Sequence, residues 1–312
     1  MFTNSNILVP TDFSPYARFA NTYALAIARN YGGTVHFVHV LDANVVSGVR
    51  GHGMWLNPSD AETLLDSMRE HASSRLTTLA EEAEGQGVRS EQHIVVGNAP
   101  QEILRLALDK QCTLIVIATH GRSGFDHVVF GSVAERVVRQ SPVPVLAIKH
   151  PEHDFVEASD LSLRIRHVLF PTDFSDFSEK GLPFAISFCR EFSAKLSLLH
   201  ATEIPIVLPE FMPDSVVSVG PEMEQAARGT LEEKKAGIPN LDVDAVSVTG
   251  VPHSEICRFA EEHGVDLIVM PTHGRSGFGH VLFGSVAEKV VRLARCPVLT
   301  IRPDGDGSAF ER

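Results

Sequence analysis

The sequence is poor in cysteine and contains no long hydrophobic run. Only four cysteines occur in 312 residues, and no two of them form a C-x-x-C pair, which argues against a disulfide framework and against thiol metal chemistry. No apolar run reaches the roughly 18–20 residues that a membrane helix needs. Residues 1–6 carry no basic side chain, so they do not resemble a secretory signal, and we expect a cytoplasmic protein.

Dense positive charge and catalytic motifs are missing as well. The formal net charge is −12, which repels a nucleic-acid backbone, and no block of Lys and Arg overrides it. We therefore expect neither a nucleic acid nor a membrane as partner. The Walker sequence G-x-x-x-x-G-K-[ST] does not occur, and no catalytic set is visible. His120 and His127 lack the carboxylate or cysteine company of a zinc site, so no protein metal site is predicted.

An internal repeat organises the chain. The segment Pro10–Ser14 recurs as Pro171–Ser175, and 18 of 21 positions from Thr119 to Arg139 are identical to those from Thr272 to Arg292. The length also suits two domains of roughly 150 residues each. We predict one domain over residues 1–150 and another over residues 164–304, joined by a polar, acidic linker near 150–163.

The repeat also indicates the role of the cysteines, because each can be compared with its counterpart in the other copy. All four counterparts are apolar, so we predict buried, structural thiols. The pairs are Cys112 with Val265, Cys189 with Ala28, Cys257 with Leu104, and Cys296 with Val143.

Short runs rich in Val, Ile and Leu alternate with longer amphipathic stretches in both copies. This pattern is typical of a parallel sheet that is buried on both faces. It predicts an α/β fold with two tandem, doubly wound, five-stranded parallel sheets of the Rossmann-like type, whose ligands bind at the carboxyl ends of the strands. The predicted strands are 6–10, 34–40, 92–96, 113–118 and 143–149, then 167–171, 195–201, 243–248, 266–270 and 297–302; the predicted helices include 15–31, 60–84 and 100–110, and residues 44–57, with Trp55, are left as a loop.

Two glycine loops follow the predicted fourth strands. In each loop a glycine is followed by nine residues and then by Gly-Ser at the start of a helix. Glycine permits positive φ and a close approach of the backbone to a phosphate, and the free N–H groups of the helix start can bind the anion. An arginine after the first glycine can add a charged hydrogen bond. The residues are Gly121, Arg122, Gly131 and Ser132, and Gly274, Arg275, Gly284 and Ser285.

This arrangement resembles the universal stress protein family over nearly the whole chain, twice. ATP-binding members of that family carry a strand-end aspartate and a loop of the form G-x2-G-x9-G-[S/T]. The resemblance implies an adenine nucleotide alpha hydrolase-like fold, a role in the stress response, and ATP as ligand with Mg²⁺ carried by its phosphates. The nucleotide-binding residues that it implies are Pro10, Thr11, Asp12, Val40, Ile117, Ala118, Gly121, Arg122, Gly131, Ser132 and Val133 in the first copy, and Pro171, Thr172, Asp173, Ala201, Met270, Pro271, Gly274, Arg275, Gly284, Ser285 and Val286 in the second.

Both copies depart from the family motif at its first glycine. That glycine lies against the ribose in the family and offers an N–H group. Ala118 keeps the N–H group and adds a methyl, whereas Pro271 has no N–H to offer. We therefore expect the second copy to bind ATP less well than the first.

Structural interpretations compete with several of these assignments. Ser132 to Glu135, and the matching Ser285 to Glu288, have the spacing of a capping box. Asp12 and Asp173 have the alternative role of helix N-caps or turn formers ahead of the first helix of each copy. His39 and His200 are interpreted as hydrogen-bonded histidines at the edge of the core rather than as ligands.

The sequence leaves three functions open. The leading hypothesis is an ATP-binding regulator, and the others are a slow ATPase that phosphorylates itself at Ser132 or Ser285, and a nucleotide-free chaperone or interaction module. The fifth strands are either plain sheet edges or, as the resemblance implies, they pair the two domains within the chain. A further homodimer and an unknown protein partner are also left open.

Overall fold

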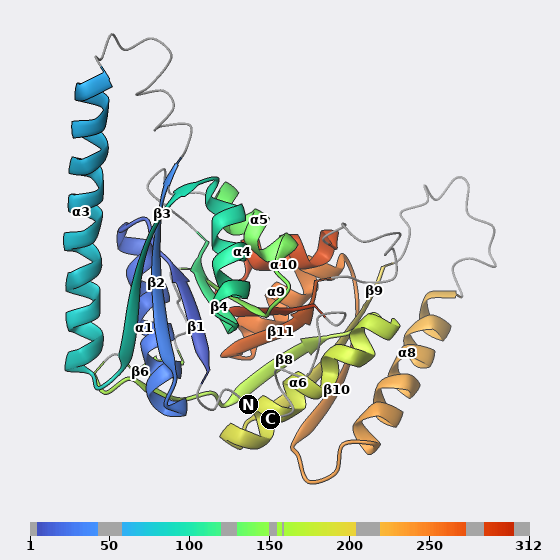
Figure 1. The fold of residues 1–312 in the computed structure, drawn as a ribbon. Helices are drawn as coiled ribbons and strands as arrows, with labels where there is room; N and C mark the ends of the chain where they lie inside the picture. The colour runs from blue at the N-terminus through green and yellow to red at the C-terminus, as the bar shows by residue number, and fades with distance from the viewer. Residues whose placement is uncertain are drawn as a thin grey trace. The chain divides into compact units, whose positions relative to one another are not determined.

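The computed structural model describes residues 5–42, 58–119, 130–149, 155–157, 159–203, 219–272 and 284–302. The chain divides into two compact units (Figure 1). The first unit is built mainly from residues 1–150 and 156–163, and the second mainly from residues 164–304.

The first unit is a parallel five-stranded sheet between two pairs of helices. Its strands lie in the order β3-β2-β1-β4-β5. Right-handed crossovers place α1 and α3 on one face and α4 and α5 on the other, and α4 packs against α5. The elements are β1 (Asn6–Pro10), α1 (Pro15–Tyr31), β2 (Thr34–Asp42), α3 (Pro58–Gly85), β3 (Arg89–Gly97), α4 (Ala99–Asp109), β4 (Cys112–Ala118), α5 (Ser132–Gln140) and β5 (Val145–Ile148).

The second unit repeats this topology. Its parallel strands lie in the order β10-β9-β8-β11-β12. The order of strands reverses beside β1 in the first unit and beside β8 in the second, which is where doubly wound sheets bind their ligands. The elements are β8 (His167–Pro171), α6 (Asp176–Phe192), β9 (Lys195–Thr202), α8 (Val219–Ala236), β10 (Val243–Thr249), α9 (Pro252–Glu262), β11 (Leu267–Pro271), α10 (Ser285–Leu293) and β12 (Val298–Ile301).

The predicted fold class is confirmed, and the predicted strands all occur. The central strands are buried on both faces, as Ile7, Leu8 and Val9 of β1 show with no exposed surface. Strand β3 begins three residues earlier than predicted, at Arg89 rather than at residue 92. Its first half is polar and exposed because β3 is an edge strand, so the apolar pattern does not reveal it. The predicted loop 44–57 lies outside the described residues.

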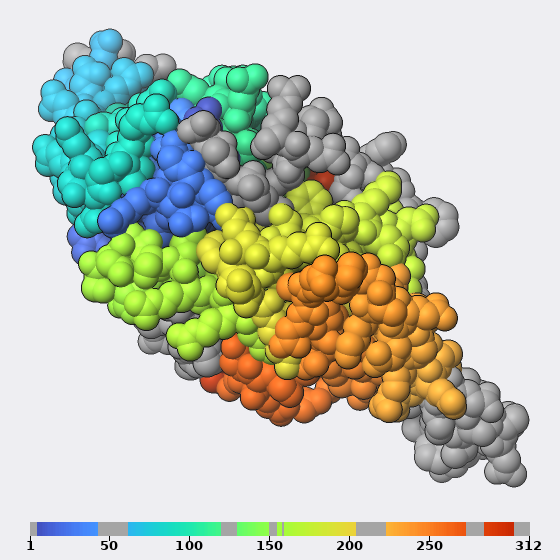
Figure 2. Space-filling view, turned by 90° about the horizontal axis from the view of Figure 1, so that it is seen from below, coloured from blue at the N-terminus to red at the C-terminus, as the bar shows by residue number. Residues whose placement is uncertain are grey.

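Helix α3 packs on the sheet through one narrow stripe of residues. Leu65, Ala72, Leu76 and Ala83 are buried, at helical spacings of seven, four and seven that keep them on one face. The rest of the described helix is mostly exposed. Figure 2 shows this helix, in cyan, at the surface of the molecule. The helix therefore covers the edge strand of its own sheet, on the face opposite α4.

The helices that follow the first strand of each unit share a serine N-cap and differ in the residue at the C-terminal cap. Ser14 caps α1 and Ser175 caps α6, each through its side-chain oxygen. Both helices end in a residue with left-handed backbone, which is Gly32 at φ 68 in α1 and Ser193 at φ 53 in α6. Glycine adopts this conformation without the steric penalty that a side chain brings.

Part of the predicted linker is structured. Val156–Glu157 (β6) and Ser162–Leu163 (β7) form an antiparallel pair that belongs to the first unit. Arg29 at the end of α1 donates to the carbonyl of Asp160 at 2.8 Å. The strands have only two residues each, so no apolar period in the sequence could predict them.

Candidate functional site

Each unit has a cavity at the carboxyl ends of its strands. The cavity volume is about 340 Å³ in the first unit and about 390 Å³ in the second. Both values fall within the roughly 300–1,000 Å³ of small-molecule sites. The first cavity is lined by Pro10, Thr11, Asp12, Ala17, Val38, His39, Val40, Ala99, Ile103, Ile117, Ala118 and 131–134. The second is lined by Pro171, Thr172, Asp173, Ser178, 199–203, Met223, Pro252, Ile256, Met270, Pro271, Thr272 and 284–287.

An aspartate begins the turn from the first strand into the first helix of each unit. Asp12 Oδ1 accepts a hydrogen bond from the Ser14 amide at 2.9 Å, and Asp173 Oδ1 accepts one from the Ser175 amide at 3.0 Å. The serines are the N-caps, so the interpretation of the aspartates as turn formers is correct and that of N-caps is wrong. A carboxylate has about four acceptor positions, so a turn bond is compatible with a ligand bond.

The residue after each aspartate has an unusual backbone. Phe13 has φ 62 and Phe174 has φ 61, a left-handed conformation that a bulky side chain rarely adopts and that costs about 1–3 kcal/mol. The preceding threonine supports it, since Thr11 Oγ1 accepts from the Phe13 amide at 3.0 Å. This conformation carries the chain sharply around the aspartate that lines the cavity.

A histidine and a phenylalanine stack beside each aspartate. The rings of Phe13 and His39 lie 4.5 Å apart, and Nδ1 of His39 lies 2.8 Å from the carbonyl oxygen of Thr11. Because a carbonyl only accepts, Nδ1 is the protonated nitrogen and donates. The interpretation of His39 as a hydrogen-bonded histidine is confirmed, and the ring also lines the cavity.

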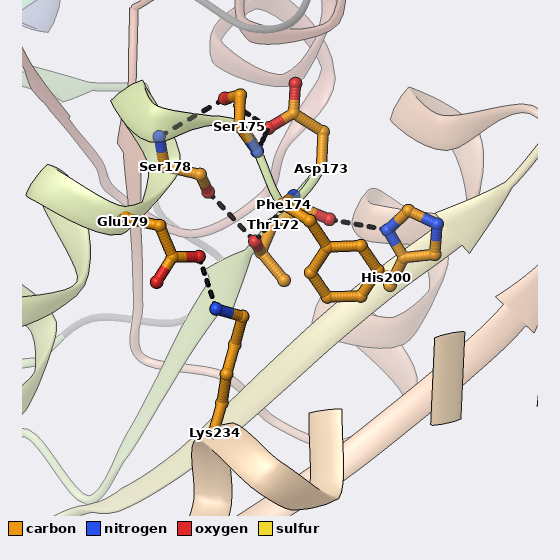
Figure 3. A network of polar contacts seen from close by, with 8 residues as sticks. All are labelled: Thr172, Asp173, Phe174, Ser175, Ser178, Glu179, His200 and Lys234. Carbon is orange, nitrogen blue, oxygen red and sulfur yellow. Dashed lines mark hydrogen bonds and ion pairs between the residues drawn. The ribbon is translucent and has the colours of Figure 1, made fainter. Parts of the chain in front are cut away.

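Figure 3 shows the matching network in the second unit. His200 donates from Nδ1 to the carbonyl of Thr172 at 2.8 Å and stacks on Phe174 with ring centroids 4.3 Å apart. Thr172 Oγ1 in turn accepts from the hydroxyl of Ser178 at 3.0 Å and from the Phe174 amide at 3.1 Å. These hydrogen bonds hold in place the turn that carries Asp173.

Helices α5 and α10, which border the cavities, each begin directly after a glycine. Gly131 is the N-cap of α5 and Gly284 that of α10, and among the described residues no side-chain cap bond is made at either helix start. The capping-box interpretation is wrong, because Ser132 lies one position inside the helix and Glu135 instead accepts from Arg139 at 2.6 Å. The N–H groups of the first turn face an opening lined by residues 131–134, which is a suitable place for an anion.

Gly131 is required for close packing and not for an unusual backbone angle. Its φ is −62 and that of Gly284 is −63, so neither glycine uses the positive φ that glycine permits. The amide of Gly131 donates to the carbonyl of Thr119 at 2.8 Å. A Cβ atom at Gly131 would lie 3.2 Å from that same oxygen. A side chain would therefore push the helix start away from the end of β4.

The N–H group of Ala118 points away from the neighbouring strand β5. The next residue, Thr119, donates to Ile148 of β5 at 2.8 Å, and successive N–H groups along a strand alternate between its two sides. The β1–β4 pairing ends at Leu8 and Ile115, so the Ala118 N–H group is directed toward the cavity beside β1. In the second unit Thr272 donates to Ile301, which gives Pro271 the same orientation without a donor.

Eighteen of the predicted nucleotide-binding residues line the two cavities. The other four, Gly121, Arg122, Gly274 and Arg275, lie outside the described residues. Sequence reasoning missed the wall that comes from α4 and α9, namely Ala99 and Ile103 in the first unit and Pro252 and Ile256 in the second. A Pro near the start of an amphipathic helix at the carboxyl end of a strand was the available signal.

The four cysteines all lie in the described part of the chain and form no disulfide, and they do not contribute to the cavity linings. Burial raises the pKa of the Cys112, Cys189 and Cys296 thiols to about 12, so they are inert at neutral pH. The predicted burial is confirmed for these three. Cys257 is only half-buried.

Comparisons with known proteins point to one family in both halves of the chain. A model described as the universal stress protein family matches residues 3–149 and 164–302. A universal stress protein of Methanocaldococcus jannaschii is 30% identical over 148 residues, covering 47% of this chain and 84% of the relative. One of Synechocystis sp. is 27% identical over 319 residues, covering 95% of this chain and 99% of the relative.

Solved structures show the same tandem fold. The crystal structure of a universal stress protein from Archaeoglobus fulgidus is similar with a TM-score of 0.69 at 22% identity, covering 96% of this chain and 97% of that one. Among the described residues, no helix combines the length and apolar character that crossing a membrane requires.

Proposed function

This chain belongs to the universal stress protein family, and from that premise we propose that it is a stress-response regulator that binds ATP. The observation that carries the proposal is the pairing of two features in one cavity. The Asp12 carboxylate and the uncapped start of α5 both line the cavity of the first unit. A nucleoside offers hydroxyl donors to the first, and a polyphosphate offers negative charge to the second.

The roles of the lining residues follow from their positions. Pro10, Thr11, Asp12 and Val40 lie at the ends of β1 and β2 and would contact the nucleoside. Gly131, Ser132 and Val133 lie at the start of α5 and would hold the phosphates through backbone N–H groups, with Gly121 and Arg122 as further proposed contacts. Mg²⁺ would arrive with the phosphates. The apolar wall of Ala99 and Ile103 excludes water from one side of the cavity.

The second unit offers a similar but poorer site. Asp173, Ala201, Gly284, Ser285 and Val286 line it in the same order, and Pro171, Thr172, Met270, Gly274 and Arg275 complete the proposed set. Its lining includes Pro271, which has no N–H group, and Glu203, whose carboxylate disfavours a nearby phosphate. We therefore propose that the first unit is the tighter ATP site.

The first test asks whether the purified chain carries a nucleotide. The protein is denatured and the released small molecules are separated by chromatography, and ATP binding is then measured by calorimetry on the nucleotide-free chain. Asp12→Ala removes a charged acceptor, which is worth about 1.5–3 kcal/mol and predicts a loss in affinity of about 10- to 100-fold. Asp66→Asn is the matched control, because Asp66 lies on α3 with 63% of its side chain exposed.

Two outcomes would contradict the proposal. If no nucleotide is released and Mg-ATP gives neither heat nor a shift in melting temperature, the chain is a nucleotide-free interaction module. If ATP is consumed steadily and the rate falls on Ser132→Ala, the chain is an enzyme. Release of AMP or a cyclic nucleotide would keep the site and correct the ligand.

A further inference from the structure

Three metal-ligating side chains meet on the first sheet, outside the nucleotide cavity. His36 of β2 pairs in register with Glu91 of β3, and Val38 pairs with His93. Residues in register or two apart share a face of the sheet, so His36, Glu91 and His93 project to the same side. We refer to these three residues as the histidine–glutamate cluster. It forms only when β2 and β3 pair, because His36 and His93 are far apart in the sequence.

The three ligand atoms are close to one another. Nδ1 of His36 lies 3.1 Å from Nε2 of His93. Oε2 of Glu91 lies 3.5 Å from the first nitrogen and 3.7 Å from the second. Ligands at 2.0–2.2 Å from a tetrahedral Zn²⁺ are separated by about 3.3–3.5 Å. The three distances bracket that value, so one cation could contact all three atoms with small side-chain adjustments.

His36 is the most buried side chain of the cluster. The side chain of His36 is only 3% exposed, and its Nε2 is buried without a hydrogen-bond partner among the described residues. One hydrogen bond between two neutral imidazoles satisfies one nitrogen of each ring. A cation on Nδ1 would not reach that Nε2 atom, so the case for the site rests on the three close ligand atoms. Burial lowers the pKa of both histidines.

The cluster is open to solvent on one side. Half of the Glu91 side chain and 14% of that of His93 are exposed, so a cation can enter and a water molecule can take the fourth position. Lys110, at the end of α4, currently occupies this side, with Nζ 2.9 Å from Oε2 of Glu91. Its side chain is 36% exposed. Lys110 thus places a partly exposed positive charge on the oxygen that a metal would use, and it would compete with the metal.

The second unit provides an internal comparison. Ser197 and Asp244 pair in register there, and Leu199 pairs with Val246. These residues stand where the first unit has His36, Glu91 and His93, since Ser197 precedes His200 by the same three residues as His36 precedes His39. Both imidazoles are absent at these positions, and Asp244 is paired with Lys195 at 2.5 Å. The second unit should therefore lack the site.

We propose that His36, Glu91 and His93 form a binding site for a divalent cation of the zinc class. The site lies in the amino-terminal half of the strands. His36 precedes His39, which lines the cavity, by three residues or about 10 Å along β2. It is therefore separate from any Mg²⁺ carried by a nucleotide, and it does not depend on the proposed ATP binding. Two imidazoles and one carboxylate favour Zn²⁺ over Mg²⁺ or Ca²⁺, which prefer oxygen ligands.

The test measures Zn²⁺ binding to the full-length chain after treatment with a chelator. Calorimetry with Zn²⁺ alone gives the stoichiometry, and the visible spectrum of added Co²⁺ reports whether the site is four-coordinate. Loss of an outer partner already lowers metal affinity about 10- to 100-fold, so removal of a ligand by His93→Gln should lower it by at least about 100-fold. Glu91→Gln should also weaken binding. Lys110→Met removes the competing charge and should strengthen it.

Asp244→Asn is the matched control, because it changes the corresponding acidic residue of the second unit and should leave Zn²⁺ affinity unchanged. Glu91→Gln alters a half-exposed side chain, so it tests the site even if the His93 variant is destabilised. The proposal is overturned if the wild-type chain gives no saturable Zn²⁺ binding, or if the Glu91 and His93 variants bind Zn²⁺ as tightly as the wild type does.

Discussion

In the first unit the chain turns from β1 into α1 through Asp12, Phe13 and Ser14. In the second unit it turns from β8 into α6 through Asp173, Phe174 and Ser175. The amide of the serine donates to the aspartate at 2.9 Å in one unit and 3.0 Å in the other. The histidine of the second strand donates to the threonine carbonyl at 2.8 Å in both. The carboxyl ends of the two sheets have therefore kept one geometry.

The amino-terminal halves of the same sheets differ. The histidine–glutamate cluster of the first unit is replaced by Ser197, Asp244 and Val246 in the second. The first residue of the first strand also changes, from Asn6 of β1 to His167 of β8. The two units therefore share the backbone turn that borders the cavity and differ in the side chains at the other ends of their strands.

Of the differences between the two cavities, we expect the largest effect where Ala118, which has an N–H group, is matched by Pro271, which has none. Ala118→Pro removes an N–H group directed at the first cavity and should lower ATP affinity there by about 2- to 10-fold, the value of one neutral hydrogen bond. Pro271→Ala restores a donor to the second cavity and should raise its affinity by a similar factor. Calorimetric ATP titration of each variant checks this.

Ala118→Pro is measured in a chain that also carries Asp173→Asn, and Pro271→Ala in a chain that also carries Asp12→Asn. One site is then observed at a time. Circular dichroism shows whether Ala118→Pro keeps the fold. Equal affinities before and after Pro271→Ala would mean that the missing donor does not distinguish the two units.

A smaller effect is expected where the helix ends differ. Ser193 has φ 53 in the position that Gly32 fills at φ 68. Ser193→Gly should stabilise the second unit by about 0.5–1 kcal/mol, and Gly32→Ser should destabilise the first by about 1 kcal/mol, because only glycine adopts this conformation without strain. Hydrogen exchange of the α6 and α1 amides measures each unit separately. A stabilised Gly32 variant would contradict the prediction.

The smallest effect concerns pH and the histidine that replaces Asn6. Burial lowers the pKa of His167, whose Nδ1 donates to the carbonyl of His263 at 3.2 Å and whose Nε2 accepts from the Ser197 hydroxyl at 2.8 Å. Below pH about 6.5 the unfolded chain binds a proton that the folded chain does not. His167 therefore makes the second unit less stable as the pH falls below that value.

His167→Asn should remove this contribution, so that unfolding free energies at pH 7.5 and pH 5.5 differ less than in the wild type. The asparagine can still donate to the same carbonyl, as Asn6 donates to the Lys110 carbonyl at 2.7 Å. Urea unfolding at both pH values is the measurement. An unchanged difference would assign the pH dependence to other groups.

Local patterns in the sequence predicted much of the fold and many of the residues around the cavities. Runs of Val, Ile and Leu located the strands because both faces of these sheets are buried. Hydrogen-bond geometry was less predictable. The spacing from Ser132 to Glu135 matched a capping box, yet Gly131 takes the capping position, because the amide of that glycine is fixed on Thr119 by packing against β4.

The sequence by itself determined the duplication, the parallel sheets and the ordering of motif residues at strand ends, because these depend on composition and on spacing along one chain. Only the tertiary structure decided which nitrogen of His39 is protonated, which helix starts are uncapped, and that His36 meets Glu91 and His93. Those features arise from the register between strands. Register is set by packing across the whole sheet, so it cannot be read from any one segment.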